Sequence, residues 1–305
     1  MRHGKYPFIL AFLLPPVAIY VLFVLSPYAQ AFLISLTDWT GTTADYAYVG
    51  FDNFARMLGD PQLRIALRNN AILLLVVPIV TVVLGLFLAS MINVGGRSRG
   101  TGVQGVRGAS VYKVVYFFPV ILSVPIIAVL FTNLFAPGVA GGLINTVLKN
   151  TIGVDHPWLG DPNTAFWVVV IAMIWSFTGF FVVLFSAAMQ SIPRDIYEAA
   201  LLDGASRITT FRKVTIPLVW DTVQVAWVYL AIQAMDAYAL VHVILGINGG
   251  PSRQGDVLGV AMWRAAFWDS RFGYASAIGV LLTVLTMIIA ITFMRLARRE
   301  RVELA

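Results

Sequence analysis

Five long apolar stretches without a charged residue constrain this chain more than any other feature of its sequence. They cover residues 8–36, 71–92, 114–135, 165–189 and 273–294. A helix needs about 20 apolar residues to cross a hydrocarbon core about 30 Å thick. A sixth stretch, 218–245, is long enough but contains Asp221, Asp236 and His242. We therefore predict six transmembrane spans.

The composition indicates that lipid is the main solvent of this chain. Of 305 residues, 59% are apolar and 12% are charged, against about 25% charged in soluble domains. The stretches lack strand-like alternation, and helices satisfy their own backbone in lipid. We predict one all-α domain over residues 1–305, a six-helix transmembrane bundle. The absence of cysteine excludes disulfides, thiolate catalysis and zinc–thiolate sites.

The basic residues predict the orientation, because lysine and arginine are retained on the cytoplasmic side. Residues 1–7, 93–113, 190–217 and 295–305 carry 14 of the 21 basic residues. We therefore expect both termini and segment 190–217 to be cytoplasmic. This orientation also accounts for the net charge of +6, so no nucleic-acid partner is needed. The first stretch is too long for a signal-peptide core, and we expect it to remain in the mature protein.

Segment 191–217, SIPRDIYEAALLDGASRITTFRKVTIP, concentrates charge between two apolar stretches. Ser191 is expected to cap a helix with Pro193 in its first turn. Gly204 is suited to end this helix in a left-handed conformation, and Ser206 to start a second helix that Pro217 closes. Two short helices with a sharp corner would form a knob, and its alanines would let the backbone come close to a partner surface. The alternative is a solvated amphipathic loop at the membrane surface.

The residues EAALLDG at 198–204 and VTIP at 214–217 resemble a known motif. It is the EAA loop in the inner-membrane subunits of binding-protein-dependent ABC importers. That motif reads Glu-Ala-Ala, three residues, Gly, nine residues, a hydrophobic residue, one residue, then a hydrophobic residue and Pro. Val214 and Ile216 are mild departures from the usual Ile and Leu. GGLINTVLKNTIG, WLGDPNTAF and NGGPS extend the resemblance to the carbohydrate-uptake (MalF/UgpA-like) permeases.

This resemblance implies a fold, a location and a set of partners. The fold would be that of a type I ABC importer permease in a bacterial inner membrane, a transport subunit and not an enzyme. Its partners would be a second related permease, two ATP-binding subunits that hold ATP and Mg, and an extracytoplasmic solute-binding protein, possibly a lipoprotein. The substrate would be a sugar or a sugar derivative. The residues that transmit ATP-driven movement into the spans would be Glu198, Ala199, Ala200, Asp203 and Gly204.

A polar stripe on the fifth span is a candidate for the substrate pathway. Tyr229, Gln233 and Asp236 are spaced i, i+4 and i+7, on one face of a helix. An acid at mid-membrane is costly and is expected to face the bundle interior or a wet cavity. Asn133 and Trp175 are further interior candidates. The stripe could instead pair helices, or Asp236 could be the proton relay of an ion-coupled secondary transporter.

Other patterns do not support a site of their own. GTGVQG at 100–105 matches G-x-G-x-x-G but opens no βαβ unit, and no G-x-x-x-x-G-K-[ST] occurs, so we expect another chain to hydrolyse ATP. The three histidines are scattered along the chain, so we expect no metal site. Outer loops 37–70, 136–164 and 246–272 are expected to contain short surface helices and to contact the binding protein.

Overall fold

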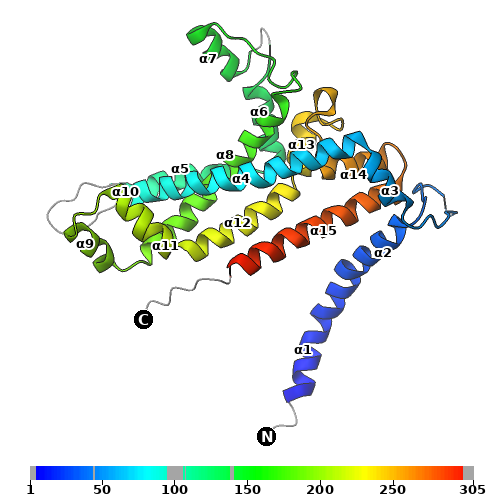
Figure 1. Ribbon diagram of the computed structural model, residues 1–305, viewed down its shortest axis with the longest axis horizontal. Coiled ribbons are helices and arrows are strands. Elements are labelled where there is room, and N and C mark those ends of the chain that lie inside the picture. The colour runs from blue at the N-terminus through cyan, green and yellow to red at the C-terminus, as the bar shows by residue number, and fades with distance from the viewer. Residues whose placement is uncertain (1–4, 44, 95–105, 107, 138–140, 298–305) are drawn as a thin grey trace. The chain divides into compact units, whose positions relative to one another are not determined.

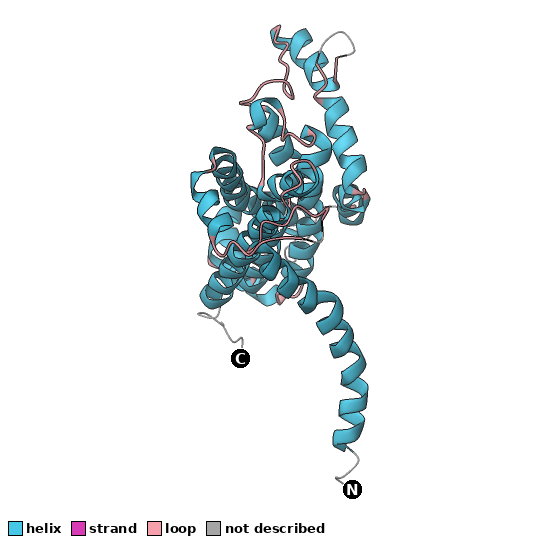
Figure 2. Ribbon diagram, turned by 90° about the vertical axis from the view of Figure 1, so that its right-hand side faces the viewer, coloured by secondary structure: helices cyan, strands magenta, loops and turns pink. Residues whose placement is uncertain are grey.

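The computed structural model describes residues 5–43, 45–94, 106, 108–137 and 141–297. Figure 2 shows that these residues form helices joined by loops, and no strand occurs among them. A single isolated bridge joins Thr37 to Tyr48. The prediction of an all-α membrane fold is therefore confirmed.

The chain divides into two compact units, which are described separately. The first unit comprises Met1–Leu63 and Ala261–Val284, and the second comprises Arg64–Val260 and Leu285–Ala305. This division is based on contacts within the chain, so the single domain over residues 1–305 stays a prediction.

The first unit combines the N-terminal helices with the helices near the C-terminus. Its elements are α1 (Lys5–Tyr20), the π-helix η1 (Val21–Leu25), α2 (Ser26–Ser35), α3 (Asp52–Gly59), the start of α4 (Pro61–Val94), most of α14 (Leu258–Phe267) and the first half of α15 (Phe272–Ala297). Buried Asn53 donates to the carbonyls of Ser35 (2.9 Å) and Thr37 (2.8 Å). The hydroxyl of Tyr274 donates to Asp60 at 2.7 Å. The two Asn53 bonds hold α3 to the end of α2, and the Tyr274 bond holds the turn after α3 to the start of α15.

The second unit contains the main apolar core. Its elements are most of α4, α5 (Ala109–Ile121), α6 (Val124–Leu134), α7 (Leu143–Ile152), α8 (Ala165–Gln190), α9 (Arg194–Leu202), α10 (Arg207–Thr210), the π-helix η2 (Phe211–Thr215), α11 (Ile216–Leu218), α12 (Trp220–Met235), α13 (Tyr238–Leu245), the 3₁₀-helix η3 (Pro251–Arg253), the first turn of α14 and the end of α15. Phe181 and Phe185 of α8 are fully buried. Gly179 allows the backbones of α8 and α5 to approach closely, because a Cβ there would overlap the carbonyl oxygen of Tyr116. Figure 1 places α7 and α9 near opposite ends of α8.

Four helical segments are long and apolar enough to cross a membrane: Phe8–Ser35, Pro61–Asn93, Ala165–Gln190 and Phe272–Arg295. Two bent pairs bring the number to as many as six, α5 with α6 at 98° and Arg207–Leu218 with α12 at 72°. In the first pair Leu122 and Ser123 are extended, and Pro125 lies in the first turn of α6, where its missing N–H costs no hydrogen bond. Pro78 lies inside the single long helix α4.

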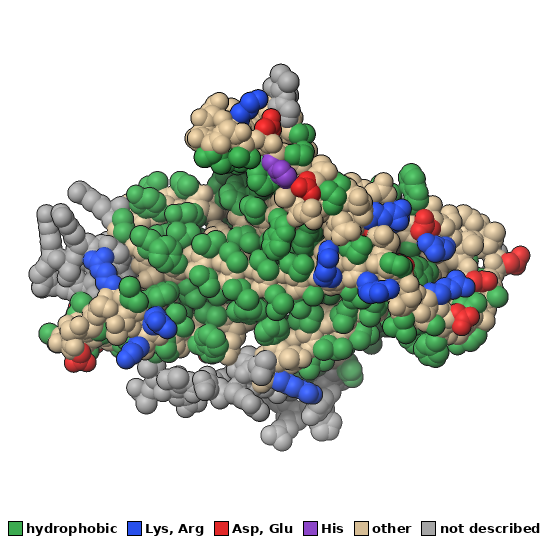
Figure 3. Space-filling model, turned by 45° about the horizontal axis from the view of Figure 1, so that its top comes forward, with side chains coloured by type: hydrophobic (Ala, Val, Ile, Leu, Met, Phe, Trp, Pro, Cys, Tyr) green, Lys and Arg blue, Asp and Glu red, His purple; other side chains and the backbone are tan. Residues whose placement is uncertain are grey.

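Many apolar side chains lie on the outside of the described chain. Figure 3 shows hydrophobic side chains over most of one face, with few charged ones among them. On α1, Phe8 and Phe12 are 70% and 72% exposed. An exposed apolar surface of this extent fits contact with lipid or with other membrane helices.

Candidate functional site

The helix that carries the EAA-like motif is α9, and its start differs from the prediction. Ser191 ends α8, and its hydroxyl donates to the carbonyl of Ala188 at 2.8 Å. The residue that precedes α9 is Pro193, which has an extended ψ of 136°. The predicted N-cap at Ser191 is therefore wrong. A proline disfavours helical geometry in the residue before it, so α9 begins only after Pro193.

The corner after α9 has the predicted geometry. Gly204 has a φ of +73°, its amide donates to Leu201, and the amide of Ala205 donates to Ala200, both at 3.0 Å. This pattern of bonds to the last carbonyls is that of a helix ended by a left-handed glycine. Ser206 precedes α10 and accepts a bond from the amide of Thr209 at 3.2 Å. We call residues 194–210 the elbow.

Pro217 does not close the second helix where the sequence placed its end. The helical path continues from α10 through η2 and α11 to Leu218, and Val219 separates it from α12. Pro217 lies in the first turn of α11, a position at which proline is tolerated. Asp221, in the first turn of α12, forms no ion pair with Arg212 or Lys213 in the part of the chain that the structure describes.

One side of the elbow is exposed, and the other is held to η2 by a buried side chain. Tyr197 is buried, and its hydroxyl lies 3.4 Å from that of Thr215 in η2. Burial raises the pKa of Tyr197, against the smaller opposing effect of this hydrogen bond. The predicted coupling residues Glu198, Ala199, Asp203 and Gly204 are exposed, and Ala200 is half-buried.

Two large apolar side chains extend this exposed face beyond the motif. Leu202 is 89% exposed and Ile208 is 71% exposed. Neither residue was predicted from the sequence as part of the site. Exposed apolar side chains rimmed by polar ones are found where a protein contacts another protein or a membrane.

The candidate pathway stripe lies at a break in the fifth span, not inside one continuous helix. α12 ends at Met235, Asp236 is the residue that follows it, and α13 begins at Tyr238. The stretch 218–245 predicted as one span is therefore divided between α12 and α13. Asp236 is exposed and Gln233 is half-buried.

Tyr229 and the two remaining candidates lie on neighbouring helices. The ring of Tyr229, 45% exposed, packs against Phe177, Phe180 and Phe181 of α8 at 6.0–6.3 Å. Asn133 on α6 is exposed, and its amide donates to its own helix at Val129. Trp175 on α8 lies 5.6 Å from Phe131 of α6. This ring contact joins α6 to α8 and does not reach the stripe on α12, so the five-residue pathway stays a prediction.

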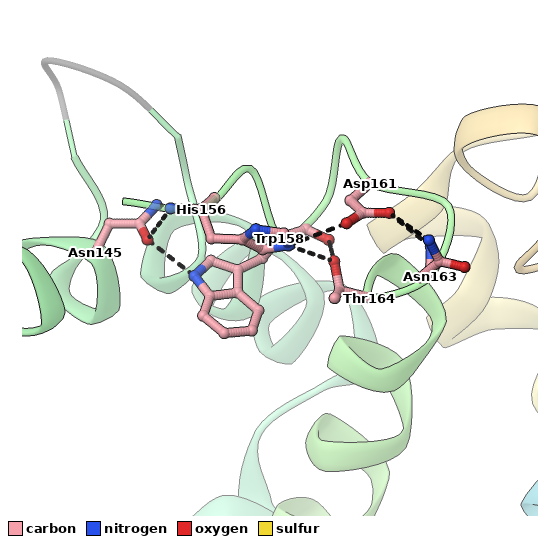
Figure 4. Close-up of polar contacts among 6 residues, drawn as sticks. All are labelled: Asn145, His156, Trp158, Asp161, Asn163 and Thr164. Carbon is pink, nitrogen blue, oxygen red and sulfur yellow. Dashed lines mark hydrogen bonds and ion pairs between the residues drawn. The ribbon is translucent and has the colours of Figure 1, made fainter. Parts of the chain in front are cut away.

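A polar cluster that spans α7 and the loop before α8 was not predicted as a site (Figure 4). Buried Asn145 accepts a bond from the indole of Trp158 at 2.9 Å. Thr164 donates to the carbonyl of Trp158 at 2.7 Å, and His156 lies 3.2 Å from both Asp161 and Thr164. The sequence WLGDPNTAF contains most of these polar residues, and their hydrogen bonds hold the loop to the start of α8.

Some predictions fall on residues that the structure does not describe. GTGVQG at 100–105 lies outside the described residues, as do most of the basic residues near both termini and in 95–107. Within the described ranges, no three His, Asp or Glu side chains are grouped so that they could hold a metal ion.

Several apolar spans and two bent span pairs indicate a multi-pass membrane protein with an exposed helical elbow. The family model described as "Binding-protein-dependent transport system inner membrane component" matches residues 54–302. The chain therefore belongs to this family of transport subunits, which are not enzymes.

Named relatives and solved structures agree with this family. The chain is 41% identical over 294 residues to the diacetylchitobiose uptake system permease NgcF of Streptomyces coelicolor, covering 95% of this chain and 82% of that one. It is 32% identical over 258 residues to the xylose/arabinose import permease XacH of Haloferax volcanii, covering 84% and 77%. A chain of the bacterial alginate ABC transporter, solved with an alginate-bound periplasmic protein, has the same fold, with a TM-score of 0.78, 22% identity and coverage of 97% and 96%.

Proposed function

We propose that this chain is a transmembrane subunit of an ATP-driven importer for a sugar or sugar derivative. An external binding protein delivers the substrate, and a separate subunit hydrolyses ATP. The observation that carries the proposal is the 41% identity over 95% of the chain to a diacetylchitobiose uptake permease. The similarity to permeases for xylose or arabinose and for trehalose or maltose supports sugars as the substrate class.

The elbow is the proposed contact with the ATP-binding subunit. Its exposed acidic and apolar side chains, Glu198, Asp203, Leu202 and Ile208, form a face that a groove of a partner would cover. The buried hydroxyl of Tyr197 holds α9 against η2. A displacement of α9 would therefore be transmitted to η2 and α11, which lead into α12. This proposal places the elbow and both termini in the cytoplasm, with ATP and Mg bound by the partner.

A second, related permease would complete the pathway. Tyr229 and Asp236 are exposed in this chain alone, and an acid at membrane depth requires protein or water around it. A heterodimer with two ATP-binding subunits would enclose this stripe. The match to a binding-protein-dependent family favours this arrangement over an ion-coupled secondary transporter with Asp236 as proton relay.

Crosslinking from Ala200 tests the elbow contact. The chain has no cysteine, so Ala200→Cys gives a single reactive site on α9, at a position that is half-buried. In the assembled transporter we expect a thiol crosslinker to join it to the ATP-binding subunit. The matched control is Thr146→Cys on exposed α7, near the opposite end of α8. Equal capture from both positions, or modification of Ala200→Cys by an impermeant reagent added outside intact cells, would overturn the proposal.

The substrate class needs a second experiment with the binding protein. Thermal stabilisation of that protein by a panel of neutral mono- and disaccharides, including diacetylchitobiose, xylose, trehalose and maltose, identifies the passenger. The stabilising sugar is expected to stimulate ATP hydrolysis by the reconstituted transporter. Stabilisation by amino acids or metal ions alone would contradict the sugar assignment.

A further inference from the structure

Two adjacent asparagines on α4 are buried and hold an outer loop in place. Asn69 and Asn70 are 0% and 2% exposed. The side-chain amide of Asn69 donates to the carbonyls of Gln254 at 2.7 Å and Asp256 at 2.8 Å. Such bonds to backbone carbonyls fix a loop whatever its side chains are. Asn69 therefore anchors the base of the loop that follows α13.

Asn70 contacts two separate elements with one side chain. Its oxygen accepts a bond from the amide of Leu258, the first residue of α14, at 2.8 Å. Its nitrogen donates to the carbonyl of Ala234 at 3.3 Å. In a continuous helix that carbonyl would accept from the amide four residues later, but α12 ends at Met235. Asn70 thus caps a carbonyl that the break in the fifth span leaves free.

The loop between these anchors is tightly closed and strained at its tip. Ser252 and Arg253 have φ values of +52° and +58°, which non-glycine residues adopt only where the surroundings hold them. Both side chains are exposed. The amide of Gly255 donates to Gly249 at 2.9 Å and closes the base. We call residues 246–257 the outer loop.

We propose that Asn70 links the position of the outer loop to the break at Asp236. A displacement of the loop moves Leu258, which pulls on the oxygen of Asn70. The nitrogen of the same planar amide then shifts against Ala234, two residues before Asp236. This inference rests on the proposed function in one respect: the partner that moves the loop during transport is taken to be the external binding protein. Asn70 is a positioning residue here.

A perturbation of the loop from within tests this link without any partner. Gly249 lies against Asp256, and a Cβ there would come within 2.5 Å of the carboxylate and 2.9 Å of the backbone. Gly249→Ala therefore forces the base of the loop to shift. The reporter is Ala239→Cys, which is exposed just beyond the break and is the only thiol in a chain without cysteine. The readout is the rate at which a charged thiol reagent modifies it in the reconstituted full-length chain.

The expected result is a dependence on Asn70. Gly249→Ala is expected to change the modification rate by about threefold or more, the range of coupling between contacting groups. With Asn70→Ala also present, the change is expected to disappear. The matched control is Asn93→Ala near the other end of the same helix, which loses bonds to Ala89 and Ser186 and is expected to preserve the change. If Asn70→Ala prevents folding, Asn70→Ser replaces it, since a hydroxyl is too short to reach both partners.

Two results would overturn the link. One is an equal effect of Gly249→Ala with and without the Asn70 amide, and the other is no effect in the chain that keeps Asn70. The measurement uses neither substrate nor ATP. Its failure is therefore separate from a failure of Ala200→Cys to capture an ATP-binding subunit, which counts against the proposed function.

Discussion

The left-handed corner at Gly204 allows a quantitative prediction about the elbow. Its φ is +73°, and nothing lies within 4 Å of the position a Cβ would take. A substitution therefore meets no steric barrier, and its cost is that of the backbone conformation alone. For an ordinary residue this cost is about 1–2 kcal/mol. Asparagine adopts this conformation more readily than other residues.

The substitutions at Gly204 are therefore expected to rank by backbone preference and not by size. Gly204→Asn should cost least, Gly204→Ala about 1 kcal/mol, and Gly204→Val about 2 kcal/mol or more, because a β-branched residue is a clear outlier at positive φ. Since about 1.4 kcal/mol is a factor of ten in an equilibrium, the valine variant should lose the bent corner in a large fraction of molecules. The bonds from Gly204 and Ala205 to the end of α9 would be lost with it.

The assay is the initial rate of sugar uptake by the reconstituted transporter, together with co-purification of the ATP-binding subunit. We expect both to fall in the order glycine, asparagine, alanine, valine. Gly153→Val is the control, since Gly153 ends α7 with a φ of +71° and equally open surroundings but lies outside the elbow. Equal uptake by the asparagine and valine variants at Gly204 would refute the conformational reasoning, and normal uptake by the valine variant would refute a role of the corner in coupling.

Three further predictions concern other parts of the chain. Gly179→Ala places a Cβ on the carbonyl of Tyr116, and this overpacking should lower the free energy of unfolding by about 1–3 kcal/mol or more. The measurement is the unfolding temperature in detergent, which should fall. An unchanged temperature would contradict the close approach of α5 and α8. The pKa of Asp60 is lowered, because bonds from Tyr274 and two backbone amides and the charge of Arg271 outweigh the opposing effect of burial. The ionised carboxylate of Asp60 therefore stabilises the fold at pH values above its ordinary pKa of 3.8. This contribution is lost as the pH falls through the lowered pKa. Asp60→Asn should therefore reduce the dependence of the unfolding free energy on pH on the acid side. Asn145→Ala leaves the indole N–H of Trp158 without its hydrogen-bond acceptor, which should destabilise the loop by about 1–3 kcal/mol. Proteolysis of residues 141–164 should therefore be faster. An unchanged rate would show that the cluster does not order this loop.

The parts of the fold set by local chemistry could be predicted from the sequence. The apolar stretches predicted helices because their length and lack of charge leave lipid-embedded helices as the stable structure. Gly204 and Ser206 predicted the two sides of the corner because each acts on its own backbone neighbours. The prediction of Ser191 as the cap was wrong because another local effect is stronger: Pro193, two residues later, decides where α9 begins.

The parts set by distant contacts could not be predicted. Nothing in the residues around Asp236 marks a break, and the carbonyl of Ala234 is capped by Asn70, which lies 164 residues away in the sequence. The two asparagines precede a long apolar stretch and resemble ordinary polar residues at the end of a span. Only the fold brings them beside the outer loop and α12.

The break at Asp236 has an electrostatic consequence for the proposed passenger. The end of α12 presents backbone carbonyls, and the negative end of a helix dipole adds to the carboxylate beside it. No lysine or arginine lies within the five charge-free stretches or in 218–245. This part of the chain therefore offers acceptors to hydroxyl donors and no permanent positive charge to neutralise a carboxylate or phosphate. If this surface lines the substrate pathway, as we propose, it would suit a neutral sugar, whose hydroxyls donate hydrogen bonds.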